Sequence, residues 1–166
     1  QTLPAAPLRV DEHGGGTSDL NGVFEAGETV DVEPSWANAG STIFTVVTQA
    51  QNFVGPAGPA YEFVDRGASY GVIPPLATSN CHDATGDCYR LRITGARPAA
   101  HWDASFDEIS VPIDAPGVQP YFSTWALHVG DSFADVPRSN QFYRHIETIF
   151  HNGVPGGRRC RRFCPH

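Results

Sequence analysis

In the middle of the chain, apolar residues alternate with polar ones or form short runs that end at Gly, Pro or Asn. A period of two is typical of β-strands, whose successive side chains point to opposite faces of a sheet. Val30 and Val32 alternate in this way, as do Ile43, Thr45 and Val47. Short strands at this spacing, with Gly and Pro in the turns, indicate an all-β antiparallel sandwich. The expected strands are Thr29–Trp36, Thr42–Phe53, Ala60–Asp65, Cys88–Thr94, Phe106–Ile113 and Pro120–Val129.

Both ends of the chain differ from this pattern. Residues 1–10 predict an extended lead-in, because Pro4 and Pro7 exclude a helix. The segment after Gly130 predicts a short amphipathic helix, with Ser139 as its N-cap and Asn152-Gly153 as its stop. The expected apolar face of this helix comprises Phe142, Ile146, Ile149 and Phe150.

A single helix of about three turns does not fold alone. It must pack on the sandwich, on a partner or on sequence outside this chain. We therefore expect a β-sandwich domain at residues 1–130 and a helical appendage at residues 131–166.

Composition narrows the class of protein. A net charge of -7 disfavours non-specific nucleic-acid binding, which requires positive charge to neutralise phosphates. No apolar run is long enough to span a membrane. The absence of Met favours an N-terminus made by signal-peptide removal and hence secretion, although a start within a longer chain would explain it equally.

The four cysteines form two close pairs, Cys81/Cys88 and Cys160/Cys164. Neither pair has the spacing of a zinc ribbon, so two local disulfides in an oxidising compartment fit better than a metal or reduced thiols. A bridge between Cys81 and Cys88 would close a short polar loop.

The stretch Asp11–Glu28, which we call the acidic loop, carries the densest chemistry in the chain. It combines acidic and amide side chains with five glycines. Calcium prefers about six to eight oxygen ligands, and glycines let a chain curl around the ion. The spacing Asp19-x-Asn21-Gly22 places donors alternately, the Val23 carbonyl is a candidate ligand, and Glu28 could close the shell. The alternative is a solvated acidic loop that holds no ion.

The loop also resembles a known motif. Asp19-Leu20-Asn21-Gly22-Val23-Phe24-Glu25-Ala26-Gly27-Glu28-Thr29-Val30, followed by Trp36-Ala37-Asn38-Ala39-Gly40, is similar to the opening of calcium-binding Ig-like β-sandwich modules of secreted bacterial proteins. The resemblance implies an Ig-like fold. It also implies structural calcium at Asp19, Asn21, Val23 and Glu28, with Asp11 and Glu12 as additions from the upstream arm.

A second resemblance covers the C-terminal part. The segments Gly130–Pro137 and Phe142–Ile149, ending at Asn152-Gly153-Val154, resemble the first half of a surface-layer homology repeat. Complete repeats of that family anchor proteins to cell-wall polysaccharide. The second helix of a repeat and its wall-binding motif are absent from this sequence, and an Arg-rich segment at residues 158–162 stands in place of a Gly-rich linker.

The remaining candidates for chemistry favour structural roles. Asp103 in His101-Trp102-Asp103 could be a metal ligand or a catalytic acid, but we expect Trp102 in the core and Asp103 as a turn cap. The seven histidines are scattered in sequence, and no H-E-x-x-H or G-x-S-x-G motif is present. We therefore expect no enzyme.

The sequence thus predicts a non-catalytic, secreted or cell-surface structural or adhesive module that is stabilised by calcium. Its expected partner is a parent multidomain chain or another copy of itself, and cell-surface polysaccharide is a further candidate. The alternative is a carbohydrate-binding module of a secreted hydrolase, in which exposed aromatic side chains stack on sugar rings. The aromatic residues available for this are Trp36, Trp102, Trp125, Tyr61, Tyr70, Tyr89 and Tyr121.

Overall fold

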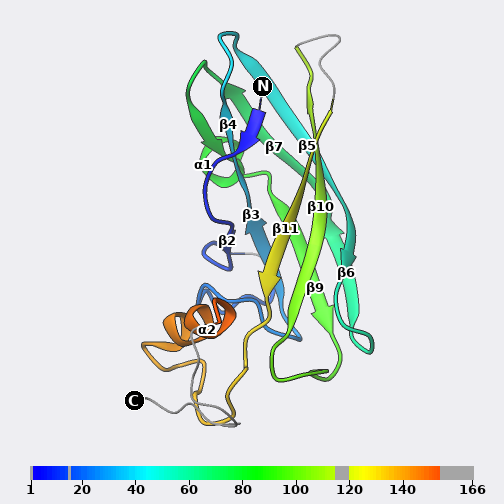
Figure 1. Cartoon of the computed structure of the whole chain (residues 1–166), viewed down its shortest axis with the longest axis vertical. Coiled ribbons are helices and arrows are strands. Elements are labelled where there is room, and N and C mark those ends of the chain that lie inside the picture. Colours follow the sequence, from blue (N-terminus) through cyan, green and yellow to red (C-terminus); the bar gives the residue numbers. More distant parts are fainter. Residues whose placement is uncertain (1, 15, 115–119, 154–166) are drawn as a thin grey trace.

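The computed structural model describes residues 2–14, 16–114 and 120–153. Its strands form two layers, which confirms the all-β, Ig-like antiparallel sandwich (Figure 1). One layer is a four-stranded sheet in the order β11-β10-β5-β7. The other layer holds two smaller sheets, β2-β3-β9-β6 and β1-β4-β8. The strands are β1 (Thr2–Pro4), β2 (Arg9–Val10), β3 (Thr29–Glu33), β4 (Ser35–Asn38), β5 (Phe44–Val54), β6 (Ala60–Asp65), β7 (Gly67–Ile73), β8 (Thr78–Asn80), β9 (Tyr89–Thr94), β10 (Asp103–Pro112) and β11 (Tyr121–His128).

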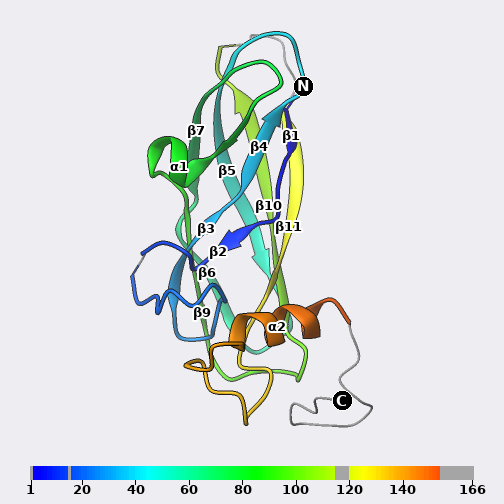
Figure 2. The ribbon, with the colours of Figure 1, turned by 90° about the vertical axis from the view of Figure 1, so that its left-hand side faces the viewer.

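The second layer divides at Pro34. The sequence predicts one strand over Thr29–Trp36, but β3 ends at Glu33 and β4 begins at Ser35. Proline has no N–H for a ladder hydrogen bond, which limits it to strand ends, edges and bulges. β3 therefore pairs with β9 and β2, and the chain then continues as β4 between β1 and β8 (Figure 2).

The core lies between the two layers and follows the expected alternation. Val30 and Val32 on β3 are buried, as predicted. On β5 the buried face comprises Phe44, Val46, Thr48 and Ala50, whereas Ile43 and Val47 are exposed. A shift of one residue moves every side chain of a strand to the other face. Alternation alone therefore located β5 without showing which of its faces is buried.

Several elements were not predicted. β7 has two glycines and an alanine among its seven residues, so its β-propensity is weak. It is held instead by its pairing with β5, where Ala68 and Tyr70 face the core and Gly71 adopts φ 60° beside a register shift. The lead-in contains β1 and β2, which pair with β4 and β3.

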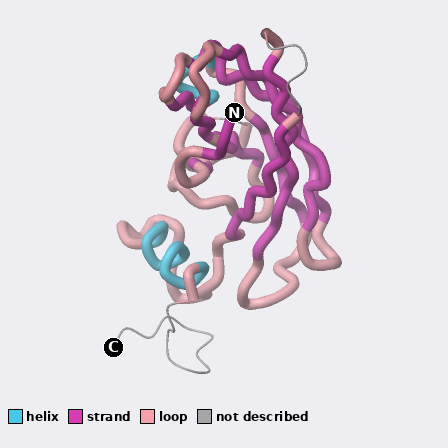
Figure 3. Tube along the Cα trace, turned by 45° about the horizontal axis from the view of Figure 1, so that its top comes forward, coloured by secondary structure: helices cyan, strands magenta, loops and turns pink. Residues whose placement is uncertain are grey.

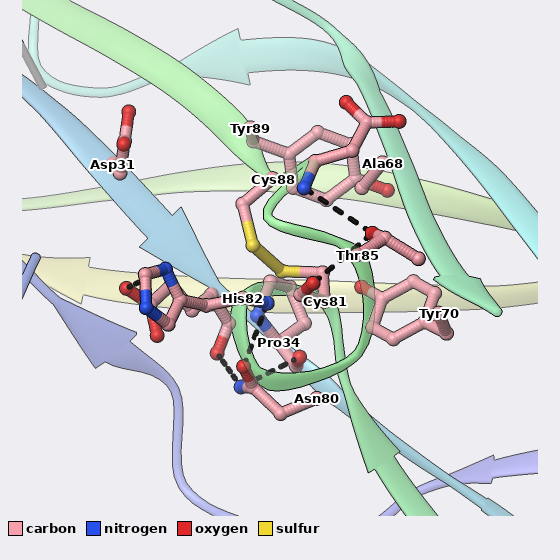
Figure 4. The surroundings of a disulfide bond; sticks show 12 residues. Asp31, Pro34, Ala68, Tyr70, Asn80, Cys81, His82, Thr85, Cys88 and Tyr89 are labelled. Carbon is pink, nitrogen blue, oxygen red and sulfur yellow. Dashed lines mark hydrogen bonds and ion pairs between the residues drawn. A yellow bond between two sulfur atoms is a disulfide. The ribbon is translucent and has the colours of Figure 1, made fainter.

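The loop between Cys81 and Cys88 was expected to be a turn, but it begins with a short helix, α1 (Cys81–Thr85). Asn80 caps this helix by accepting hydrogen bonds from the backbone N–H groups of His82 and Asp83, and Gly86 ends it in the left-handed region. Figure 4 shows the Cys81–Cys88 disulfide that joins the start of α1 to the residue before β9, as predicted. Cys160 and Cys164, the second predicted pair, lie outside the described residues.

Most large aromatic side chains belong to the core. Trp36, Trp102, Tyr70 and Tyr89 are fully buried. Tyr70 and Tyr89 donate hydrogen bonds to Oε1 of the buried Glu108, and Trp125 Nε1 donates to its Oε2 at 2.6 Å. Each oxygen of this buried carboxylate therefore has a donor, as a stable buried charge requires.

The C-terminal segment packs against one end of the sandwich through α2 (Tyr143–His151), and Figure 3 shows α1 and α2 well separated along the molecule. Ser139 is not the N-cap, because the helix starts four residues later with Phe142 at the cap and no side-chain cap bond. Tyr143, Ile146 and Glu147 are buried, whereas Phe142 and Ile149 are more exposed than predicted. Within the described residues, no helix is long and apolar enough to cross a membrane.

A small apolar cluster joins this segment to the acidic loop. It contains Val23 from the loop together with Val136, Tyr143 and Ile146, and Phe133 packs against it. Gly130 leads into the segment, and a Cβ at that position would lie 2.5 Å from the Tyr143 hydroxyl and 2.6 Å from Val23. The close approach of α2 therefore requires glycine there.

Candidate metal sites

The acidic loop folds around the carboxylate of Asp11. Asp11 is fully buried and has a positive φ of 52°. One of its oxygens accepts a hydrogen bond from the Ser18 hydroxyl, and the other accepts one from the Asn21 backbone N–H at 2.9 Å. Its backbone carbonyl accepts the Gly22 N–H at 3.2 Å. Because two parts of the loop fold back onto one residue, the carboxylates that follow are brought close to it.

Three of the predicted calcium ligands converge at this point. Asp11, Asp19 and Glu28 each offer a carboxylate oxygen, and these oxygens lie within 4.8 Å of one another. Asp11 and Glu28 are buried, and Asp19 is exposed. Separation of this size between anionic oxygens is unfavourable without a positive charge among them.

Glu25 adds a third buried carboxyl group, beside Glu28. Oε2 of Glu25 and Oε2 of Glu28 are both buried without a hydrogen-bond donor among the described residues. Burial, reinforced by the adjacent Glu28, raises the pKa of Glu25 to about 9. Burial is also the main cause that raises the pKa values of Glu28 and Asp11. In contrast to Glu108, Glu25 and Glu28 each have one carboxyl oxygen without a donor among the described residues.

The side chains of the other predicted ligands, Asn21, Val23 and Glu12, have contacts of their own. The Asn21 side chain is engaged within the loop, since its Nδ2 donates to Glu25 at 2.9 Å and its Oδ1 accepts the Val23 N–H at 2.8 Å. The side chain of Val23 packs in the apolar cluster under α2. Glu12 lies outside the converging group and forms an ion pair with Arg144.

Arginines of the C-terminal segment contact the same loop. Arg138 Nη1 lies 2.9 Å from Glu28 Oε1, and Arg138 also forms an ion pair with Asp131 at 2.6 Å. From the sequence, the cation that compensates the negative charge of the acidic loop was expected to be a bound metal ion. In the structure, Arg138 supplies part of it, but it contacts Glu28 Oε1 and leaves Oε2 without a donor.

A second group, which we call the histidine cluster, comprises His101, Asp103, His128 and His151. Its ligand atoms lie within 4.8 Å of one another. Asp103 is the first residue of β10, not the turn cap that was predicted, whereas Trp102 is buried as expected. Residue 101 precedes β10, residue 128 ends β11, and residue 151 ends α2.

Asp103 stands at the centre of this cluster. Its Oδ2 lies 2.6 Å from His101 Nε2. Its Oδ1 lies 3.1 Å from both His128 Nδ1 and His151 Nδ1. The three imidazole rings surround it, with centroids 5.3–5.9 Å apart.

A buried carboxylate orients the far side of one ring. His128 Nε2 lies 2.8 Å from Glu147 Oε2. Glu147 is only 1 % exposed, and it also accepts hydrogen bonds from the backbone N–H and the hydroxyl of Ser132, at 2.9 Å and 2.6 Å. Sequence reasoning missed the cluster, because its residues belong to three separate elements. The pair His101 and Asp103 was the only local signal.

A third group joins His13 and His82 to Glu33 near the disulfide. The two rings stack with centroids 3.6 Å apart, and His13 Nδ1 lies 2.6 Å from Glu33 Oε1. His82 Nδ1 lies 4.0 Å from the same oxygen. This group offers one carboxylate and two rings, fewer groups than the histidine cluster provides.

The donor set of the acidic loop fits calcium. The converging group consists of hard carboxylate oxygens, two of its members are buried, and no described residue donates to Glu28 Oε2. Calcium accepts carboxylates in one- or two-oxygen modes and completes its shell with backbone carbonyls and water. Asp11, Asp19 and Glu28 are therefore the residues that would hold the ion.

A scan against protein-family models finds no match for this chain, and a search of curated proteins finds none either. Among solved structures, the chain is similar to the ASH / PapD-like domain of human CEP192 (PapD-like domain 7), with 12% sequence identity and a TM-score of 0.35. The similarity covers 76% of this chain and 86% of that chain.

Proposed function

We propose that the chain is a calcium-stabilised structural or adhesive module of a secreted or cell-surface protein, and that it acts by binding and not by catalysis. The observation that carries this proposal is the convergence of the Asp11, Asp19 and Glu28 carboxylates, in which the buried Oε2 of Glu28 has no donor among the described residues. A divalent cation at that point would hold the acidic loop against β3, which begins at Thr29 directly after Glu28. The ion would therefore stabilise the start of the sandwich.

An extracellular location suits this chemistry. Extracellular calcium modules function with dissociation constants of about 10⁻⁴–10⁻³ M, which a partly exposed site with three carboxylates can reach. The Cys81–Cys88 disulfide is consistent with the same oxidising environment. The resemblance of the loop to secreted bacterial modules supports the same assignment.

The adhesive part of the proposal is supported by the outer face of the larger sheet. Val47 on β5 and Val72 on β7 are exposed, and Phe122 on β11 is 62% exposed. Phe122 pairs directly with Ile109 of β10 on this face. Exposed apolar side chains gathered on one sheet are typical of association surfaces. Sedimentation analysis should show concentration-dependent association that Phe122→Ser weakens.

The carbohydrate-binding alternative receives less support from the described residues. Trp36 and Trp102 lie in the core, and the indole N–H of the half-buried Trp125 is bonded to Glu108. A stacking platform needs an exposed aromatic face. Glycan binding without association of the chain would favour this alternative.

Calcium binding is tested by thermal unfolding of the full chain in calcium and in excess chelator. We expect calcium to raise the stability by about 2.7 kcal/mol at a hundredfold excess over Kd. Asp19→Asn should abolish most of this gain, and because Asp19 is exposed, the variant should fold. Asp114→Asn, at an exposed acid beyond the far end of β10, is the matched control and should keep the gain. Equal melting temperatures in calcium and chelator would refute the proposal.

A further inference from the structure

We propose that the histidine cluster is a zinc site that fastens the C-terminal helix to the sandwich. The proposal rests on the geometry of His101, Asp103, His128 and His151, and it does not depend on calcium binding at the acidic loop. Three imidazole nitrogens and one carboxylate make a donor set of the type that zinc binds with tetrahedral geometry.

The distances are close to those that a zinc ion imposes. Tetrahedral bonds of about 2.0–2.1 Å separate neighbouring ligand atoms by about 3.3 Å. Asp103 Oδ1 lies 3.1 Å from the Nδ1 atoms of both His128 and His151, and Oδ2 lies 2.6 Å from His101 Nε2. All four ligand atoms lie within 4.8 Å of one another, so side-chain adjustments alone would bring the four groups to bonding distance of one ion.

The environment of His128 suits a metal ligand. Its Nε2 lies 2.8 Å from Glu147 Oε2, and in the neutral tautomer with the proton on Nε2 this nitrogen would donate to that carboxylate. Its Nδ1 is then a lone pair, and it faces another carboxylate, Asp103. Two acceptors facing each other repel unless a cation or a second ring proton lies between them. A zinc ion provides that cation and leaves the ring neutral, as a ligand must be.

Glu147 has the place of an outer-shell residue. Ligating histidines almost always donate their second ring N–H to a carboxylate, a carbonyl or water, which fixes the orientation of the ring. Glu147 is buried and is itself held by the Ser132 N–H and hydroxyl. This carboxylate therefore orients His128 toward Asp103, and it comes from α2, the same helix that provides His151.

The position of the cluster defines what zinc would do. His128 ends β11, Asp103 begins β10, and His151 ends α2. The ion would therefore bridge two paired strands of the sandwich and the last residue of the helix. Four protein ligands leave no open coordination position, as in structural zinc sites. We infer that zinc holds α2 in place and takes no part in a reaction.

The test is a zinc titration of the calcium-saturated full chain by calorimetry, with bound metal counted by mass spectrometry after dialysis. The chain carries Cys160→Ser and Cys164→Ser, so that these thiols do not compete for the ion. We expect one zinc per chain, and in the cobalt form the visible absorption of a tetrahedral site. His151→Ala and His101→Ala should each weaken zinc binding by more than about 100-fold.

Two histidines outside the cluster provide matched controls. His145 is exposed on the same helix, so His145→Ala changes an α2 histidine without changing a proposed ligand. His13→Ala changes the other group of rings. Both controls should bind zinc as the parent does. Unchanged affinity in His151→Ala and His101→Ala, or loss in His13→Ala alone, would overturn the proposal, as would a parent chain that binds no zinc. Circular dichroism shows whether each variant is folded, and the calcium-dependent melting shift of the same samples reports the acidic loop separately.

Discussion

The acidic loop and the histidine cluster both contact the C-terminal segment, yet the chain builds them in different ways. The loop draws Asp11, Asp19 and Glu28 from one stretch of sequence and offers only oxygen. The cluster draws its residues from the start of β10, the end of β11 and the end of α2, and it offers mainly imidazole nitrogen. A cavity of about 330 Å³ has walls from both regions, including Gly22, Val23, His128 and His151.

This difference shows which kind of site can be recognised from the sequence and which only from the folded structure. Donors that are close in sequence and separated by glycines indicate a cation loop before any fold is known. Donors that are distant in sequence indicate nothing until the strands have paired. The two sites also differ in their chemistry, since hard oxygens select calcium and imidazoles select zinc. The two proposed ions would therefore fasten the same segment independently of each other.

The largest expected loss of stability comes from a substitution at the apolar contact between α2 and the acidic loop. Ile146 of α2 is buried in the apolar cluster that also contains Val23 of the acidic loop. Ile146→Ala should lower the free energy of unfolding by about 2–5 kcal/mol, because it leaves a cavity and loses apolar burial. Urea unfolding measures the loss. Ile149→Ala, at a position that is 48% exposed, is the control and should change the stability by less than about 0.5 kcal/mol. Equal losses in the two variants would mean that α2 does not pack as described.

Glu28→Gln should affect calcium binding at the acidic loop and leave zinc binding at the histidine cluster unchanged. The substitution removes a buried carboxylate that is proposed as a calcium ligand and is the partner of Arg138. We expect it to remove most of the calcium-dependent stability, up to about 2.7 kcal/mol at a hundredfold excess of calcium. Zinc affinity should be unchanged. Glu12→Gln, which removes the ion pair with the exposed Arg144, should cost less than about 1 kcal/mol. A calcium shift that survives Glu28→Gln would place the ion elsewhere.

Glu147→Gln should have the opposite result, weakening zinc binding and leaving the effect of calcium unchanged. Loss of the carboxylate leaves His128 without its anionic partner, and outer-shell changes of this kind lower metal affinity by about 10–100-fold. Calorimetry with zinc should detect this weakening, whereas the calcium-dependent melting shift should stay as in the parent chain. Weakening of both metals together would show that Glu147 acts on the packing of α2 and not on one site.

The last prediction is a pH dependence of the stability, which should be strongest without calcium. A carboxyl group whose pKa is higher in the folded chain binds more protons when folded, so stability falls as the pH rises from the unfolded pKa toward the folded one. Burial raises the pKa of Glu25 from 4.5 to about 9, and it raises those of Glu28 and Asp11 in the same direction. In excess chelator, the melting temperature should therefore decrease between about pH 5 and pH 8. Saturating calcium should reduce this slope. A melting temperature that rises with pH in chelator would contradict the prediction.

Much of the sandwich could be predicted, because alternation marks strands that have one buried face. β6 was located with its correct bounds, and β5, β9, β10 and β11 with errors at their ends. The burial of Val30 and Val32 also followed from the pattern. The orientation of β5 did not follow, because both of its faces carry apolar residues. β7 was missed because its small residues gain their stability from pairing and not from propensity.

The candidate sites divide in the same way. Asp19 and Glu28 were predicted as ligands, with Asp11 and Glu12 as additions from the upstream arm, and the structure brings Asp11, Asp19 and Glu28 together. Glu12 forms an ion pair with Arg144 instead. Asp103 was assigned to a turn because its partners His128 and His151 are remote in sequence.

The sequence by itself determined the fold class, the short disulfide loop and the position of the acidic loop, since each depends on residues that are near one another along the chain. The tertiary structure alone decided which face of β5 is buried, how α2 packs and which histidines meet. Those features depend on strand pairing and on contacts between distant segments, and the order of side chains along a chain does not record such contacts.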